Sequence, residues 1–351
     1  MFLQLLKPLI LSATISFIMT PLVRKFFIKK GFVEDPQTKQ QKTKNATALS
    51  TVPRGGGISI FLAISISSLI FLKLDKHLFG ILLAALISLM VGIWDDIKDV
   101  NPKTRFLFNI LVSLIVVGAG IGIAYISNPF GGVIDLSLPR LTFTFFGTHS
   151  IWIISDLLAI IWITWCMNIV GWATGVDGQL PGFTAISAIF IGLLALKFSQ
   201  DITQWPVIVL AGAVAGAYIG FLPFNFFPQI IMPGYSGKSL AGFFLAVLAI
   251  LSGAKLATLI LLLGIPMIDA VFVLTKRLLN KKSIMHSDAS HLHHQLLKIG
   301  WSRPQIAIFY WSISFVLGLV ALFLNSSQKF YAFLGLIILF SGFVLKVYQR
   351  N

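Results

Sequence analysis

The sequence predicts an all-α fold, a polytopic integral membrane bundle of about eleven transmembrane helices in a single domain, residues 1–351. Two observations carry this prediction. The chain is 57% hydrophobic and 11% charged, with a mean hydropathy of +0.90, whereas soluble domains carry about 25% charged residues. The apolar residues also form uninterrupted runs long enough to cross a bilayer as helices, without the alternation that transmembrane strands show.

Short polar segments separate the apolar runs and set the approximate bounds of the predicted spans. The runs are 3–23, 56–72, 78–94, 105–126, 151–170, 183–198, 206–223, 239–252, 256–275, 305–324 and 330–347. Pro21, Arg24 and Lys25 follow the first run, where a signal peptide would have a cleavage site with small residues. We therefore interpret the first run as a retained span.

The net charge of +15 is unevenly distributed. With the N-terminus outside, 20 Lys and Arg residues fall on the cytoplasmic side and 7 on the outer side. This asymmetry follows the positive-inside rule and predicts a multi-pass protein of the cell membrane with a cytoplasmic C-terminus. Topology and attraction to anionic lipid account for most of the basic residues, so we expect no nucleic-acid partner. The single cysteine, Cys166, excludes a disulfide framework.

Polar residues gather on the predicted cytoplasmic side. The clusters are PRGGG (53–57), DDIKD (95–99), NIVGWATGVDGQLPG (168–182), FNFFPQIIMPGYSGKS (224–239) and SDASHLHHQLLKIG (287–300). We expect the loops at about 24–55, 95–104, 171–182, 224–238 and 276–304 to form one active-site face.

Asp95 and Asp96 directly follow an apolar run, where an unpaired buried charge would cost several kcal/mol. Adjacent carboxylates commonly hold a divalent ion or act as a base toward a phosphate, so we predict that this pair is catalytic and binds metal. Asp99 is explained equally well as a solvated loop residue. Asp177 lies in a glycine-rich turn whose backbone can approach an anion. Asp269, inside the ninth run, is either functional or paired with a neighbouring helix.

The segment HLHH contains His291, His293 and His294. Their spacing matches no common structural zinc site, and nearby lysines favour an anionic, phosphate-bearing ligand, with a solvated amphipathic loop as the alternative. The segment GYSGKS at 234–239 ends like a Walker A motif, but position 232 is Met where that motif needs Gly. A looser anion-binding loop with Lys238 at the start of a helix stays open.

These clusters, in this order, resemble the polyprenyl-phosphate N-acetylhexosamine-1-phosphate transferase family, of glycosyltransferase family 4 type. The resemblance covers about residues 35–301 and is carried by PRGGGI, DDIKDVNPKTR and DASHLHHQLLKIG. Within the family, PRGGG and HLHH are similar to the branch that transfers N-acetylglucosamine-1-phosphate from the UDP-sugar to undecaprenyl phosphate. The resemblance implies the first membrane step of cell-envelope glycan synthesis, with release of UMP.

The resemblance also implies residue roles. Asp95 and Asp96 would contact the lipid phosphate and a Mg²⁺ ion, with Mn²⁺ as an alternative metal. Asn168 and Asp177 would line the nucleotide and metal pocket, and the three histidines would hold the diphosphate. We include Arg54, Asp99, Lys238 and Asp269 among the substrate-binding candidates.

Two segments depart from the family pattern. The family has Asn-x-x-Asn-x-x-Asp-Gly-x-Asp-Gly, whereas this chain has Asn168, Gly171, Thr174 and Asp177 at the corresponding positions. The family loop GDxGS is replaced by residues 234–239. Three interpretations stay open: Asp95, Asp96 and Asp177 hold Mg²⁺ with water molecules, Lys238 supplies the missing positive charge, or activity is lost.

We expect direct attack of the carrier phosphate on the β-phosphorus of the UDP-sugar, with Asp95 or Asp96 as base or orienting group. A Mg²⁺-dependent intramembrane prenyltransferase is an alternative, but the chain lacks a second Asp-rich motif. A transporter would place polar residues near the membrane midplane rather than at one face. A catalytically impaired homologue that binds lipid-linked sugars is the third alternative. A homo-oligomer is compatible with all of these.

Overall fold

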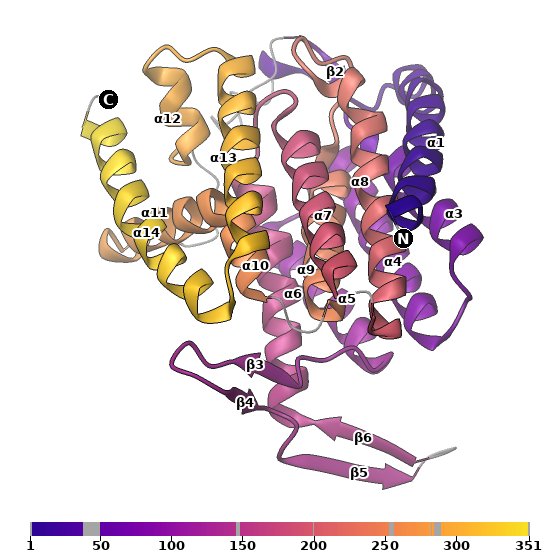
Figure 1. Cartoon of the computed structure of the whole chain (residues 1–351). Helices are drawn as coiled ribbons and strands as arrows, with labels where there is room; N and C mark the ends of the chain where they lie inside the picture. Colours follow the sequence, from indigo (N-terminus) through magenta and orange to yellow (C-terminus); the bar gives the residue numbers. More distant parts are fainter. Residues whose placement is uncertain are drawn as a thin grey trace.

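The computed structural model describes residues 2–37, 50–144, 148–198, 200–252, 256–281, 283 and 289–349. Parts of the predicted loops 24–55 and 276–304 therefore lie outside the described residues. The described chain is mainly helical (Figure 1). The helices are α1 (Phe2–Lys29), α3 (Gly56–Phe71), α4 (Lys76–Lys98), α5 (Pro102–Gly118), α6 (Ile153–Ala173), α7 (Gln179–Lys197), α8 (Trp205–Asn225), α9 (Gly234–Leu251), α10 (Leu256–Leu262), α11 (Gly264–Leu279), α12 (Leu292–Lys298), α13 (Arg303–Phe323) and α14 (Ser326–Gln349).

The helices confirm a polytopic, helical membrane protein. Each predicted run coincides with one helix, except 256–275, which α10 and α11 share across a bend of 78°. In the described part of the chain, eight helices are long and apolar enough to span a membrane, and the bent pair would make a ninth. Helices α3, with 16 residues, and α5, with 17, are shorter than these. The count of eleven stays a prediction.

Several helix ends differ from the predicted bounds. The fourth run was expected to continue to residue 126, but α5 ends at Gly118. Gly120 has a φ of +91°, a left-handed conformation that glycine adopts without steric cost and that commonly follows a helix end. Helices α7 and α9 begin at Gln179 and Gly234, four and five residues before the predicted runs. Polar residues of two predicted loops therefore belong to the first turns of helices.

In the residues that the structure describes, six short strands form three antiparallel pairs. Strands β1 (Val33–Glu34) and β2 (Val52–Pro53) pair beside the PRGGG segment. Strands β3 (Tyr125–Ser127) and β4 (Val133–Asp135), and β5 (Arg140–Thr144) and β6 (Thr148–Trp152), form two hairpins that the hydropathy pattern did not predict. These hairpins project from one end of the bundle, whereas β2, α12 and the C-terminus lie at the opposite end (Figure 1).

Helix α9 forms the centre of the bundle. Its residues from Leu240 to Ala249 are almost completely buried, and it packs against α3, α4, α6 and α7. Large apolar side chains of the outer helix α14, such as Ile338 and Leu339, are about three-quarters exposed, at 74% and 77%. An exposed apolar surface of this kind is expected where helices contact lipid.

Helices α1 and α8 pack unusually closely because one face of α8 carries glycines at every fourth position. A Cβ atom at Gly212, Gly216 or Gly220 would lie 2.1–2.4 Å from a backbone oxygen of α1. Ser12 Oγ of α1 also donates a hydrogen bond to the carbonyl of Ala213 at 2.6 Å. Small residues at this spacing are a common basis of helix association in membranes. This contact fixes the position of α1 against α8.

Candidate active site

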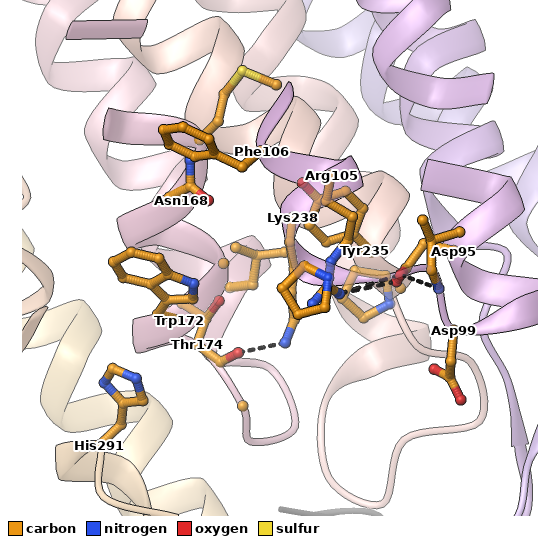
Figure 2. Close-up of a pocket in the computed structure, with 18 of the residues that line it drawn as sticks. Asp95, Asp99, Arg105, Phe106, Asn168, Trp172, Thr174, Tyr235, Lys238 and His291 are labelled. Carbon is orange, nitrogen blue, oxygen red and sulfur yellow. Dashed lines mark hydrogen bonds and ion pairs between the residues drawn. The ribbon is translucent and has the colours of Figure 1, made fainter. Parts of the chain in front are cut away.

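A cavity of about 1360 Å³ lies among α4, α5, α6, α9, α11 and α12, and Figure 2 shows part of its lining. Most of the predicted site residues line it: Arg54, Asp95, Asp99, Asn168, Lys238, His291, His293 and His294. Figure 2 shows Asp95 and Asp99 on one side, His291 on the other and Lys238 between them. Asp96, Asp177 and Asp269 are not among the lining residues. The structure thus brings the five predicted clusters together, but three of the predicted acids contact the protein instead of the cavity.

Asp96 caps the N-terminus of α9. Its Oδ1 accepts a hydrogen bond from the backbone N–H of Tyr235 at 2.6 Å, and its Oδ2 accepts from the N–H and the hydroxyl of Ser236 at 3.3 and 2.6 Å. The first N–H groups of a helix have no partner within the helix, and a carboxylate there satisfies them. Gly234 has a φ of +67°, and a Cβ atom there would lie 2.3 Å from Asp96 Oδ2. The start of α9 therefore binds an anionic side chain, the Asp96 carboxylate, and a ligand anion at residues 234–239 stays a prediction.

Asp95 faces the cavity because neighbouring residues on a helix point about 100° apart. Its carboxylate accepts hydrogen bonds from Arg105 Nη1 at 3.2 Å and from the backbone N–H of Val100 at 3.0 Å. Arg54 Nη2 lies 3.5 Å from it. The Arg105 guanidinium also lies over the Tyr235 ring, 4.9 Å from its centroid. The two adjacent acids therefore have different surroundings, with Asp95 in the cavity wall and Asp96 behind it.

Arg54 connects the PRGGG segment to the acids of α4. Its guanidinium lies 3.4 Å from Glu34, 3.5 Å from Asp96 and 2.8 Å from Asp99. Burial lowers the pKa of Arg54, but the charges of Asp96, Glu34 and Asp99 outweigh this effect and raise it above its ordinary value. Arg54 is therefore always charged, and it fixes the cavity wall where β2 meets α4.

Lys238 and the loop before α7 form the inner wall. Lys238 Nζ donates a hydrogen bond to the backbone carbonyl of Thr174 at 2.6 Å (Figure 2). The Gln179 side chain holds this loop in place, accepting from the N–H of Gly175 and donating to the carbonyl of Ala173, both at 2.9 Å. Thr174 and Lys238, which belong to the two segments that depart from the family pattern, are thus in direct contact.

Asp177 lies behind the same loop. Its Oδ2 accepts a hydrogen bond from the backbone N–H of Gln229 at 3.2 Å, and Arg303 Nε lies 3.7 Å from its Oδ1. Burial raises the pKa of Asp177, while the Gln229 N–H and the Arg303 charge oppose the increase. Asp177 therefore links this loop to the segment before α9 and to the start of α13.

The histidine segment forms the wall opposite α4. Asp269 of α11, fully buried, accepts hydrogen bonds from His291 Nδ1 at 2.9 Å and from the N–H of Leu292 at 2.8 Å. The rings of His291 and His293 are parallel, with centroids 6.2 Å apart. Burial, followed by the nearby His294, His291 and Lys238, lowers the pKa of His293 well below its usual value. His293 is therefore neutral at physiological pH.

An apolar wall continues from the charged end of the cavity. Residues at helical spacing on α6 and α5 form it: Leu157, Ile160, Ile161, Trp165, Phe106 and Ile110. Leu157 and Ile161 line the cavity and are more than half exposed. From Leu157 to Trp172 the lining face of α6 is about 22 Å long, at a rise of about 1.5 Å per residue. We call this face the α6 groove.

The three carboxylates predicted to hold a metal ion have different partners in the structure, and the metal site stays a prediction. In the described part of the chain, no group of three His, Cys, Asp or Glu side chains is placed to share a metal ion. Asp95 lines the cavity, but the oxygens of Asp96 bind the first turn of α9, and Asp177 contacts Gln229 and Arg303. Asp95 and Asp96 point in different directions from α4, and Asp177 lies in the loop before α7, so the three acids have different partners.

Sequence reasoning missed several lining residues. Arg105 lies inside the quoted DDIKDVNPKTR segment, one helical turn after Pro102, and could have been found as a cation near Asp95. Tyr235, in the segment 234–239, has no sequence signal of its own, but its ring lies under the Arg105 guanidinium. Arg277, in the basic last turn of α11, also lines the cavity. Arg105 and Arg277 each had a local signal in their charge or in their position at a helix end.

Comparison with known proteins identifies the family of this chain. The model of glycosyl transferase family 4 matches residues 78–253, half of the chain. The chain belongs to this family. A relative from Bacillus subtilis, named a probable undecaprenyl-phosphate N-acetylglucosaminyl 1-phosphate transferase, is 28% identical over 91% of this chain and 84% of its own. The family that the ordered motifs suggested is thereby confirmed.

Two further relatives represent two activities within the family. The undecaprenyl-phosphate alpha-N-acetylglucosaminyl 1-phosphate transferase of Thermotoga maritima is 27% identical over 91% of this chain and 90% of its own. The phospho-N-acetylmuramoyl-pentapeptide-transferase of Chloroherpeton thalassium is 30% identical over 77% and 79%. The similarity therefore extends over nearly the whole bundle.

Proposed function

We propose that this protein transfers N-acetylglucosamine-1-phosphate from its UDP-sugar to undecaprenyl phosphate and releases UMP. The names of the relatives from Bacillus subtilis and Thermotoga maritima describe this activity for those proteins. The PRGGG and HLHH segments, by which the branch was predicted, both contribute to the cavity through Arg54 and the three histidines. N-acetylglucosamine is therefore the first candidate among the UDP-linked N-acetylhexosamines.

One observation carries the proposal: the same cavity has a cationic end and a long apolar groove. Arg54, Arg105 and Lys238 lie at the charged end, and α6 provides the groove. A polyprenyl phosphate needs both, because its chain is insoluble in water and its phosphate is costly to bury in lipid. The charged end suits the carrier phosphate and the diphosphate of the sugar nucleotide together.

The chemistry assigned to the chain is positioning and charge stabilisation. An oxygen of the carrier phosphate attacks the β-phosphorus of the UDP-sugar; a new P–O bond forms, and the bond to the bridging oxygen breaks as UMP leaves with the electron pair. Asp95, together with Arg54 and Arg105, orients the attacking phosphate, because it lines the cavity while Asp96 caps α9. Lys238 and the histidine segment face the diphosphate. Mg²⁺ or Mn²⁺ is assigned no step, since the predicted carboxylates do not form a shared site.

The proposed orientation places the cavity end of the bundle in the cytoplasm. Five of the Lys and Arg residues predicted to be cytoplasmic line the cavity and support this orientation: Arg54, Lys98, Arg105, Lys238 and Arg277. The N-terminus would then be outside and the C-terminus inside the cell membrane, with eleven crossings. Residues of a single chain line the cavity, so the proposed reaction needs no second copy, and a homo-oligomer would not change it.

The test is UMP release by the purified full chain in lipid nanodiscs, with undecaprenyl phosphate and UDP-N-acetylglucosamine. We expect UMP only when both substrates are present, and Asp95→Asn to reduce the rate strongly. Substitution of UDP-N-acetylgalactosamine or the muramyl-pentapeptide nucleotide then determines the sugar. Absence of UMP with every nucleotide would contradict the proposal.

A catalytically impaired homologue is the second candidate function. One observation favours it: the described residues contain no preformed three-ligand metal group. Such a protein would bind the sugar nucleotide or the carrier and release no UMP. Measuring binding and UMP release on the same preparation separates the two functions.

A further inference from the structure

The Arg105 guanidinium contacts both the Asp95 carboxylate and the Tyr235 ring (Figure 2). We propose that Tyr235 is a positioning residue for the carrier: its ring holds Arg105 in the orientation that binds the phosphate of the polyprenyl chain. The inference rests on the proposed function. It gives a role to a residue of the segment 234–239, which departs from the family pattern.

Two arginines lie close to Asp95, and Arg105 is the more accessible of them. The Arg105 side chain is 28% exposed and the Arg54 side chain is 13% exposed. Arg54 also lies 3.4 Å from Glu34 and 2.8 Å from Asp99, so several acids share its charge. The Asp95 side chain is only 1% exposed. A ligand that reaches this ion pair from the cavity therefore meets the Arg105 guanidinium and not the carboxylate.

The contact with Asp95 uses one nitrogen of the guanidinium. Arg105 Nη1 donates to both oxygens of Asp95, at 3.2 and 3.3 Å. A guanidinium has five N–H donors in one plane, and a phosphate binds best to an edge that presents two of them. The orientation of the plane therefore decides whether the Nε–Nη2 edge meets a phosphate in the cavity that Arg105 lines.

The Tyr235 ring restricts the orientation of that plane. Arg105 Cζ lies 4.9 Å from the ring centroid, within the range of a cation–π contact. Tyr235 is itself held at both ends: its backbone N–H donates to Asp96 at 2.6 Å, and its hydroxyl donates to Asn109 Oδ1 at 3.2 Å. Asn109 lies one turn after Arg105 on α5, so the tyrosine lies along both residues. The two adjacent acids of α4 thus hold one member of the cation–π pair each.

Arg105 also lies where the charged end of the cavity meets the apolar wall. The next residue, Phe106, lines that wall, and so does Ile110, one turn later on the same helix. A phosphate bound to Arg105 is therefore next to a surface that suits a prenyl chain. The diphosphate of the sugar nucleotide is assigned to the histidine segment on the opposite wall, so Arg105 should serve the carrier.

The experiment measures UMP release by the purified full chain in lipid nanodiscs, with each substrate varied in turn. Tyr235→Leu should raise the KM for undecaprenyl phosphate about tenfold, because the cation–π contact is lost and a freely rotating arginine must be ordered on binding. The KM for UDP-N-acetylglucosamine should stay within about twofold, since that substrate is assigned to the other wall. Tyr235→Phe keeps the ring and should retain the affinity for the carrier.

A double variant tests whether Tyr235 acts through Arg105. Arg105→Gln removes the guanidinium, and the addition of Tyr235→Leu should then raise the KM for the carrier no further. Additive losses overturn the inference, and so does a rise of both KM values in Tyr235→Leu.

Tyr331→Leu is the matched control, because Tyr331 is exposed on α14 and does not line the cavity. Both KM values should be unchanged in this variant. Thermal unfolding in the same nanodiscs identifies any variant that fails to fold, and Tyr235→Met, which also lacks the ring, then replaces Tyr235→Leu.

Carrier binding, measured by native mass spectrometry of the same nanodiscs with undecaprenyl phosphate, separates the inference from the proposed function. We expect Tyr235→Leu to weaken binding about tenfold and Tyr235→Phe to leave it almost unchanged, whether or not UMP forms. If no UMP forms with any nucleotide, the proposed function fails, and the binding data still decide the role of Tyr235. Equal carrier affinity in Tyr235→Leu and wild type overturns the inference, as does an equal loss in Tyr235→Leu and Tyr235→Phe.

Discussion

Asp269 accepts a hydrogen bond from His291 Nδ1 at 2.9 Å, although Asp269 lies on α11 outside the cavity lining and His291 lies within it. The same carboxylate accepts the N–H of Leu292 at 2.8 Å. A carboxylate in this position fixes the tautomer and the orientation of the ring, and leaves Nε2 as the atom available to a ligand. Asp269 is therefore a positioning residue that acts through His291.

The first prediction concerns this pair. Asp269→Asn should reduce UMP release about 10- to 100-fold, the range typical of partners that orient a functional histidine. The double variant with His291→Ala should be no slower than His291→Ala alone, because both changes remove the same oriented ring. UMP release at saturating substrate measures both effects. Additive losses in the double variant would show that Asp269 acts independently of His291.

Asp95 and Asp96 should respond differently to substitution, which is the second prediction. Asp96→Ala removes the acceptor for two backbone N–H groups of α9 and should cost about 1–3 kcal/mol of stability. Asp95→Asn should reduce UMP release more strongly than it reduces stability, since Asp95 lines the cavity. Thermal unfolding and UMP release on the same preparations compare the two.

Ser236→Ala is the control for this comparison. It removes only the hydroxyl that donates to Asp96 at 2.6 Å and leaves the backbone N–H in place. Its loss of stability should be smaller than that of Asp96→Ala. An Asp96→Ala protein that is fully stable but inactive would show instead that Asp96 contacts substrate.

The third prediction concerns Asp177 and pH. Burial raises the pKa of this group above its unfolded value, so the folded state binds the proton more tightly. The protonated Asp177 carboxyl therefore contributes to the free energy of unfolding. This contribution is fully present below the unfolded pKa, about 3.9, and is lost as pH rises through the folded pKa. At neutral pH the ionised Asp177 therefore lowers stability. Asp177→Asn should be more stable than wild type at pH 7–8, with no difference at about pH 3.5.

If Asp177 has a functional role, Asp177→Asn should lower activity while it raises stability. UMP release should fall at neutral pH while the unfolding temperature rises, the relationship expected where a functional residue costs stability. Arg303→Gln, which removes the cation 3.7 Å from Asp177, should lower stability at neutral pH and so serves as the opposite control. Equal stability of wild type and Asp177→Asn at every pH would contradict the prediction.

The sequence predicts the helices well because continuous apolar runs have few alternatives in a membrane. It also predicts the polar end, since Arg54, Asp95, Asn168, Lys238 and the histidines all line one cavity. It could not predict which acid faces that cavity. Asp95 and Asp96 are adjacent, and only the packing of α4 against α9, 140 residues later, decides which one caps the helix.

Other features depend on contacts that no local pattern carries. The hydrogen bond between Lys238 and Thr174 joins residues 64 positions apart. The sequence alone therefore does not show that the two segments that depart from the family pattern contact each other. The hairpins β3–β4 and β5–β6 lie mostly between the predicted runs 105–126 and 151–170, in a segment to which the hydropathy pattern assigned no structure. Strand pairing of this kind follows from turn geometry and register, which a hydropathy average does not include.

The last prediction tests the α6 groove. Ile161→Trp should raise the KM for undecaprenyl phosphate about tenfold, since a larger side chain that crowds the bound prenyl chain should cost about 1–3 kcal/mol, as overpacking does in protein cores. The KM for the UDP-sugar should stay unchanged, because Ile161 lies on the apolar wall, away from Lys238 and His293. Ile154→Trp on the same helix is the matched control, since Ile154 is exposed but does not line the cavity.

The length of the carrier separates binding in the groove from a general effect on the fold. With a short prenyl phosphate that reaches only the charged end, Ile161→Trp and wild type should have the same KM, because the groove is then empty beside residue 161. A tenfold difference that persists with the short carrier would mean that the substitution disturbs the charged end. An unchanged KM for undecaprenyl phosphate in Ile161→Trp would place the lipid chain elsewhere on the bundle.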